Sequence, residues 1–193
     1  IRLAIHEFFH TWNVKRIRPS NLGPFDYTQE VYTPLLWVME GFTSYYDSLI
    51  QCRSGLISPK QYLQTIQERI GSYWAQPGRL IQSLEESSFT TWIKFYRQDE
   101  QYINSGISYY LKGSFVALIL DLHLRATSDN EKSLDDVMRY LWHLYGKRDV
   151  GFSEDDGIGL DVLDDSPCET HCAHFFLCRW AFSDYFFLKI LKP

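Results

Sequence analysis

Apolar residues recur at helical spacing through most of the chain, and no clear pair of strands can be recognised. Helices are predicted over residues 1–14, 31–52 and 58–74. The third of these starts with a serine followed by a proline, which is a typical helix start. Residues 15–30 are rich in proline and glycine and predict a loop. Because a helix is already under way at the first residue, we expect the chain to be a piece of a longer protein.

The second half of the chain continues the helical pattern after an irregular stretch. Residues 76–104 predict irregular structure with a short helix near 90–96. A long apolar helix is predicted over 105–126, and Ser133 is predicted to cap another that ends near Gly146. The hydrophobic pattern therefore predicts a mainly α fold.

Composition and charge exclude several classes of protein. The 193 residues are enough for one sizeable domain, and 45% hydrophobic with 22% charged residues exclude a disordered chain. A net charge of −5 leaves no basic field for nucleic acid, so no nucleic-acid partner is expected. No uninterrupted apolar stretch reaches the roughly 20 residues that a membrane-spanning helix needs, so no membrane span is expected.

The first residues that carry chemistry are His6-Glu7-Phe8-Phe9-His10, on the first predicted helix. Residues four apart share one helix face, so the two imidazoles can bind one zinc ion from a rigid backbone. Glu7 lies one position along and would stand beside the metal, where it can accept a proton from an activated water. We therefore expect one Zn²⁺ per chain, with a coincidental match as the alternative.

A catalytic zinc ion needs a third protein ligand, and Glu40 is the candidate. It lies within the strongly apolar segment Trp37–Tyr46. A buried carboxylate needs a cationic partner, which is either zinc or one of the basic residues Lys15, Arg16 and Arg18. Because two histidines stand at ligand spacing, we favour the zinc interpretation. The intervening residues contain a loop and a helix start, so two antiparallel helices can bring all three ligands together.

A zinc-bound histidine usually donates its second N–H group to a carboxylate or a carbonyl. Asp47 and Thr43 follow Glu40 on the same predicted helix and are the candidates for this role. The sequence does not choose between them, and Asp47 is equally well explained as a solvated helix residue.

Five ordered blocks of sequence carry a resemblance to a known family. They are HEFFHTWNVKRIRP at 6–19, GPFDY at 23–27, LWVMEGFTSYY at 36–46, ESSF at 86–89 and ISYYLKG at 107–113. Together these blocks resemble the glycyl aminopeptidase family of metallopeptidases, and the resemblance extends over residues 1–156.

This resemblance implies a zinc peptidase of the gluzincin kind. It implies His6, His10 and Glu40 as zinc ligands and Glu7 as the general base. It also implies the helical half of a thermolysin-like domain and an aminopeptidase that prefers small N-terminal residues, glycine above all. The catalytic domain would then occupy residues 1–156.

A catalytic tyrosine is also implied, by similarity to related gluzincin aminopeptidases. The run Tyr110-Leu111-Lys112-Gly113 is similar to the segment that supplies it there. A phenol can donate a hydrogen bond to the oxyanion that forms on the scissile carbonyl. Tyr110 is favoured over its neighbour Tyr109, and a purely structural core tyrosine is the alternative.

The expected partners are a peptide substrate and two further domains of the parent protein. Members of the family typically carry an N-terminal β-rich domain before this region and a PDZ domain after it, and neither is present in this sequence. The strand that aligns the substrate would belong to the missing β part. A non-catalytic, zinc-stabilised interaction domain is therefore the alternative function. The compartment stays open, with the cytoplasm favoured because these residues contain no signal peptide.

Residues 157–193 are expected to form an atypical tail, unrelated to the family or produced by a frameshift. Cysteine and histidine are concentrated there, at Cys168, His171, Cys172, His174 and Cys178. Their spacing is not that of a zinc finger or zinc knuckle, so an adventitious cluster is favoured over a second metal site.

Overall fold

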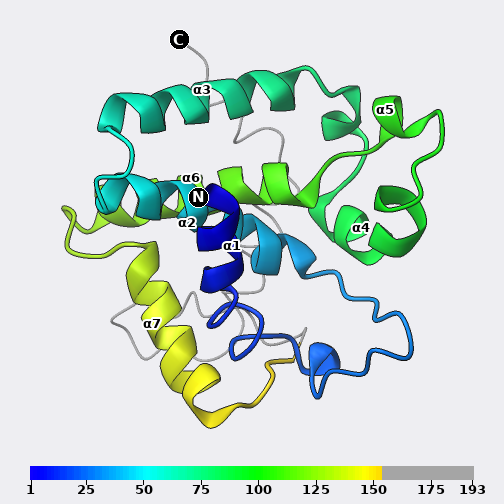
Figure 1. The fold of residues 1–193 in the computed structure, drawn as a ribbon, viewed down its shortest axis with the longest axis horizontal. Helices are drawn as coiled ribbons and strands as arrows, with labels where there is room; N and C mark the ends of the chain where they lie inside the picture. The colour runs from blue at the N-terminus through cyan, green and yellow to red at the C-terminus, as the bar shows by residue number, and fades with distance from the viewer. Residues whose placement is uncertain (154–193) are drawn as a thin grey trace.

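The computed structural model describes residues 1–153, which form helices joined by loops (Figure 1). The α-helices are α1 (Arg2–Phe9), α2 (Phe42–Arg53), α3 (Pro59–Trp74), α4 (Leu84–Phe89), α5 (Tyr102–Ser105), α6 (Tyr109–Thr127) and α7 (Leu134–Leu144). The shorter turns are the 3₁₀-helices η1 (Ser20–Leu22), η3 (Pro77–Leu80) and η5 (Gly146–Arg148) and the π-helical turns η2 (Trp37–Gly41) and η4 (Thr91–Phe95). No strand occurs within residues 1–153, so the predicted mainly α fold is confirmed.

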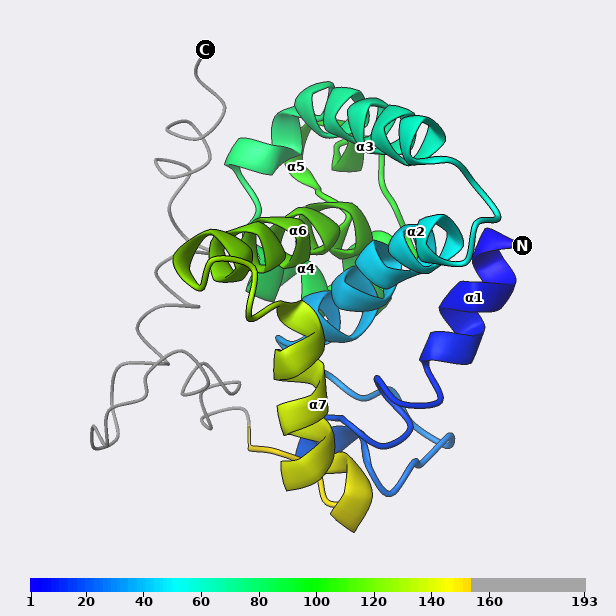
Figure 2. The same ribbon diagram turned by 90° about the vertical axis from the view of Figure 1, so that its left-hand side faces the viewer.

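Helix α6 is the centre of the fold (Figure 2). It packs against η2 and α2 on one side, and it also contacts α3, α4 and α7. By length and composition alone, residues Tyr102–Thr127 are long and apolar enough to cross a membrane. However, 50% of an apolar 18-residue stretch within this segment is buried inside the fold. Burial of this kind is what a central core helix requires.

Two glycines allow η2 to lie directly on α6. A Cβ atom on Gly113 would come within 2.6 Å of the Trp37 carbonyl oxygen, and one on Gly41 would come equally close to the Gly113 backbone. No side chain fits between the two backbones at this crossing. Glu40 of η2 is therefore carried close to Tyr110, which lies one helical turn before Gly113.

Helix α1 packs across α2, which brings the two halves of the candidate site together (Figure 1). The ring of Phe9 stacks on Tyr46 with 4.6 Å between centroids and 22° between planes. This contact fixes the face that α1 presents to η2 and α2.

Several predicted helix boundaries are corrected by the structure. The first helix ends at Phe9 instead of continuing to residue 14, because the chain turns there and Val14 has a φ of 129°, outside the helical region. The second begins at Trp37 instead of residue 31, because Pro34 disfavours helical backbone at the residue before it.

Other boundaries agree or differ by a few residues. Helix α3 follows the predicted Ser58 cap, which forms a capping box with Gln61. The helix ends at Trp74, as predicted. Helix α6 starts at Tyr109, because the side chain of Ser108 is its cap. Helix α4 was not predicted, although its Ser83 cap is a recognisable signal. The predicted domain limit at residue 156 and the cysteine- and histidine-rich tail lie outside the described residues.

Candidate metal centre

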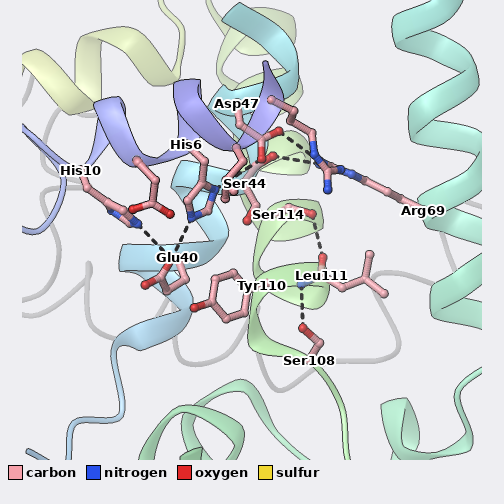
Figure 3. A pocket seen from close by; sticks show the side chains of 13 residues that line it. His6, His10, Glu40, Ser44, Asp47, Arg69, Ser108, Tyr110, Leu111 and Ser114 are labelled. Atoms are coloured by element: carbon pink, nitrogen blue, oxygen red, sulfur yellow. Dashed lines mark hydrogen bonds and ion pairs between the residues drawn. The ribbon is translucent and has the colours of Figure 1, made fainter. Parts of the chain in front are cut away.

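His6, His10 and Glu40 come together at the meeting point of α1 and η2 (Figure 3). The Nε2 atoms of the two histidines lie 3.1 Å and 3.2 Å from the same carboxylate oxygen, Oε2 of Glu40. One potential ligand atom from each residue lies within 4.8 Å of the others. His6 lies on α1 and His10 directly follows its last residue, so their spacing of four places both imidazoles on one face. The packing of η2 then adds the Glu40 carboxylate as the third group.

The second ring nitrogen of each histidine faces an acceptor that orients the imidazole. Nδ1 of His6 lies 3.4 Å from Oδ2 of Asp47, and Nδ1 of His10 lies 2.9 Å from the carbonyl oxygen of Asn13. With its proton on Nδ1, a neutral imidazole presents the lone pair of Nε2 to the centre of the site. Two imidazole nitrogens and one carboxylate oxygen form a donor set that suits zinc, so the residues fit this ion.

Asp47 is therefore the carboxylate that faces His6, and Thr43 has a different set of contacts. Thr43 donates its hydroxyl to the Met39 carbonyl at 2.6 Å and accepts from the Asn13 amide at 3.1 Å. Asn13 could not be identified from the sequence, because its role depends on how the chain turns after α1.

The three site residues shift one another's pKa values. Hydrogen bonds to Asp47 and Glu40 raise the pKa of His6 to about 9. Burial lowers the pKa of His10, but the hydrogen bond to Glu40, the charge of Glu40 and the hydrogen bond to Asn13 together outweigh burial, so the net pKa is raised. Burial also opposes ionisation of Glu40, yet the two histidines bring its pKa down to about 2. The carboxylate is thus ionised and its charge is directed at the two imidazoles.

Asp47 is itself held by residues outside the donor set. Its Oδ1 atom accepts hydrogen bonds from Ser48 Oγ at 2.6 Å and from Arg69 of α3 at 3.1 Å. Arg69 also donates to the carbonyl of Ser44 and to the hydroxyl of Ser48. Helix α3 therefore helps to fix the carboxylate that orients His6.

A cavity of about 600 Å³ opens over these residues. Its wall contains the three residues of the donor set together with Glu7, Tyr110 and Arg69. The donor set, the Glu7 carboxylate and the Tyr110 phenol therefore line one and the same cavity.

The two adjacent tyrosines at the start of α6 have different surroundings. The hydroxyl of Tyr109 accepts a hydrogen bond from Thr91 at 3.1 Å in the core, away from the cavity. Tyr110 lines the cavity, and its ring centroid is 6.1 Å from that of His6. Burial and the charge of Glu40 hold the pKa of Tyr110 far above its ordinary value, so its phenol remains a proton donor.

The ion pair considered as an alternative for Glu40 does not form. Arg16 and Arg18 both pair with Asp149, at 3.4 Å and 2.9 Å. The ammonium group of Lys15 lies 4.5 Å above the ring of Phe25. The described cationic partners of Glu40 are the two histidines.

Two comparisons with known proteins find similarity to aminopeptidases. The sequence profile described as M61 glycyl aminopeptidase matches residues 1–116, which is more than half of the chain. A crystal structure of an aminopeptidase N family protein from Idiomarina loihiensis is similar, with a TM-score of 0.79 and 40% sequence identity. The match covers 88% of this chain and 28% of that one, so this chain spans little more than a quarter of its solved relative. A search of curated proteins found no match.

The fold agrees with this relationship, since the residues described form a helical arrangement like that of the aminopeptidase N family protein. The predicted resemblance to this family is thereby confirmed. The chain belongs to the M61 glycyl aminopeptidase family.

Proposed function

We propose that the chain is the helical part of a zinc-dependent aminopeptidase that removes small N-terminal residues, such as glycine, from peptides. The observation that carries this proposal is the convergence of His6, His10 and Glu40, with both Nε2 atoms directed at one carboxylate oxygen. Membership of the family supports hydrolysis of peptide bonds, and the preference for glycine is part of the proposal.

In this proposal, His6, His10 and Glu40 hold one zinc ion per chain. When bound, zinc would supply a Lewis acid that polarises the scissile carbonyl and lowers the pKa of a water molecule. The Nδ1 contacts to Asp47 and to Asn13 keep the two imidazoles in the tautomer that ligation requires.

Glu7 and Tyr110 divide the remaining chemistry between them. The Glu7 carboxylate accepts a proton from the attacking water and then delivers it to the leaving amine. The Tyr110 phenol donates a hydrogen bond to the oxygen on which negative charge develops. Both side chains line the cavity that contains the donor set, which supports these roles.

A second candidate is a non-catalytic domain that zinc stabilises. It rests on the same three residues, because two imidazoles and one carboxylate can hold a zinc ion whether or not a peptide reaches it. The β-rich and PDZ domains of the parent protein, together with the peptide, remain the proposed partners.

Metal content and hydrolysis separate these candidates. We expect inductively coupled plasma mass spectrometry to find about one zinc per dialysed chain, as a three-ligand site requires. Glu40→Ala should lose the ion, and a variant that lacks Cys168, Cys172 and Cys178 should keep it. Zinc that leaves with the cysteines would contradict the proposed site.

Hydrolysis of glycine-terminated peptides then tests the catalytic role of Glu7. In an enzyme, Glu7→Gln should keep zinc and lose about 10²–10⁴-fold in rate. Glu68→Gln changes an exposed glutamate on α3 in the same way and should leave the rate unaltered. A chain that binds zinc but has no hydrolysis for Glu7→Gln to remove would support the non-catalytic domain instead.

A further inference from the structure

We propose that Asn13 is a positioning residue that holds His10 and Glu40 in the relative placement that metal binding requires. This inference rests on the proposed function, because it concerns the same donor set. Asn13 lies outside the donor set and acts through the two elements that it joins.

Asn13 has contacts to both sides of the site, and 1% of its surface is exposed. Its carbonyl oxygen accepts the hydrogen bond from Nδ1 of His10 at 2.9 Å. Its side-chain amide donates to the carbonyl of Met39 at 2.8 Å and to Oγ1 of Thr43 at 3.1 Å, and lies 3.3 Å from the carbonyl of Val38. One buried residue thus bonds to one histidine and to the turn that carries the carboxylate.

The contact to Met39 acts directly on Glu40. The Met39 carbonyl belongs to the peptide group that leads into Glu40, so fixing this oxygen also fixes the start of the Glu40 backbone. Glu40 lies in the π-helical turn η2, where hydrogen bonding departs from the regular α-helical ladder. The Thr43 hydroxyl donates to the same Met39 carbonyl at 2.6 Å. Asn13 and Thr43 together hold the turn that directs Glu40 toward the histidines.

The residue after Asn13 has an unfavourable backbone conformation. Val14 has a φ of 129°, which is strongly disfavoured for a β-branched residue. The Val14 amide donates to the Ile17 carbonyl, and the Ile17 amide donates to Trp12 at 2.8 Å. This closed turn directs the Asn13 carbonyl at His10 while the Asn13 side chain points to η2 and α2.

The two histidines therefore have different partners. His6 faces the Asp47 carboxylate, which can raise the basicity of the imidazole by its charge. His10 faces a neutral carbonyl, so the contribution of Asn13 is one of position. This difference predicts that replacing the Asn13 amide changes the geometry of a bound metal as well as its affinity.

The test measures metal binding without any assay of turnover. Affinity for Zn²⁺ is measured by competition with a chromophoric chelator, and geometry by the visible absorption of the Co²⁺-loaded chain. Asn13→Asp keeps the size of the side chain and the backbone carbonyl that faces His10. Its carboxylate cannot donate a hydrogen bond to the Met39 carbonyl or to Oγ1 of Thr43. We expect its Kd for Zn²⁺ to rise by about 10–100-fold and its Co²⁺ bands to shift.

Matched variants separate position from general stability. Thr43→Val removes the hydroxyl and should weaken Zn²⁺ binding in the same direction, whereas Thr43→Ser keeps it and should bind like the wild type. Asn21→Asp makes the same chemical change at an exposed asparagine and should alter neither readout. All affinities are compared at a temperature where circular dichroism shows each variant folded.

The outcomes are distinct. A folded Asn13→Asp chain with wild-type affinity and an unchanged Co²⁺ spectrum would overturn the inference while leaving the proposed function intact. If Asn13→Asp does not fold, wild-type affinity and spectrum in Thr43→Val would overturn it. A wild-type chain that binds no Zn²⁺ would overturn the proposed function and this inference together.

Discussion

Gly41 and Gly113 lie back to back where η2 crosses α6, and a Cβ atom on Gly41 would come within 2.6 Å of the Gly113 backbone. Glu40 directly precedes one of these glycines, and Tyr110 lies one turn before the other. The close crossing therefore determines how near the carboxylate of the donor set lies to the phenol across the cavity.

Replacing Gly113 with alanine should push α6 away from η2. The added methyl group would meet the Trp37 carbonyl oxygen at 2.6 Å, and backbone atoms cannot move aside as a flexible side chain can. We expect a loss of about 1–3 kcal/mol in the free energy of unfolding, measured by urea denaturation. Gly71→Ala is the control, because Gly71 of α3 has open space around it and should gain about 0.5–1 kcal/mol in helix propensity. Equal changes in the free energy of unfolding for Gly113→Ala and Gly71→Ala would contradict the close contact between η2 and α6.

Asp47 should matter for metal affinity because it orients His6. In Asp47→Asn the charge that faces Nδ1 is lost, along with the ion pair to Arg69. We expect the Kd for Zn²⁺ to rise by about 10–100-fold in chelator competition. Asp129→Asn, at an exposed position after α6, should bind like the wild type. An unchanged Kd in a folded Asp47→Asn chain would show that the 3.4 Å contact to His6 has no part in binding.

Much of the site can be predicted from the sequence because its first half is local. His6 and His10 lie on one helix face whatever the rest of the chain does. Glu40 can be nominated because a carboxylate in an apolar helix needs a partner, and its actual partners are the two histidines. Helix geometry and the cost of burying a charge are therefore enough to nominate all three residues.

The other features of the site depend on tertiary structure, which the spacing of apolar residues along the chain does not predict. The apolar pattern of α1 continues to Trp12, so the pattern does not predict that the helix ends at Phe9. It also does not predict that Asn13 turns toward the site. The choice of Asp47 over Thr43 depends on how α2 rotates against α1. Helix α4 differs, because its Ser83 cap with Glu86 three residues later is a local signal that could have been recognised.

Asp121 of α6 should make the fold sensitive to acid. Its buried carboxylate accepts hydrogen bonds from the Leu134 amide at 2.7 Å, from Tyr45 at 2.7 Å and from Arg125 at 2.9 Å. Burial alone would raise the pKa of Asp121, but these donors outweigh burial and the pKa lies below its ordinary value. Its contribution is therefore present above the unfolded-state pKa of about 3.9 and is lost as pH falls through the lower folded-state pKa.

Asp121→Asn tests this contribution by its pH dependence. We expect the variant to lose about 1–3 kcal/mol in the free energy of unfolding near neutral pH, because buried donors are left without their carboxylate. The difference from wild type should shrink as pH falls below about 4 in urea titrations. Asp99→Asn, at an exposed position, should change stability by less than about 0.5 kcal/mol. A difference that does not vary with pH would exclude an ionised Asp121 as the cause.

Tyr109 and Tyr110 offer the sharpest separation of structure from chemistry, because the same substitution can be made at neighbouring positions. Tyr110→Phe removes a phenol that lines the cavity, so the turnover of glycine-terminated peptides should fall by about 10²–10³-fold while zinc content stays the same. Tyr109→Phe removes a hydroxyl that faces Thr91 in the core, so it should cost about 1–3 kcal/mol in the free energy of unfolding. Turnover by the folded Tyr109→Phe chain should stay close to wild type. Steady-state kinetics and urea denaturation on both variants test the pair, and a larger kinetic loss in Tyr109→Phe would reverse the assignment of the catalytic phenol.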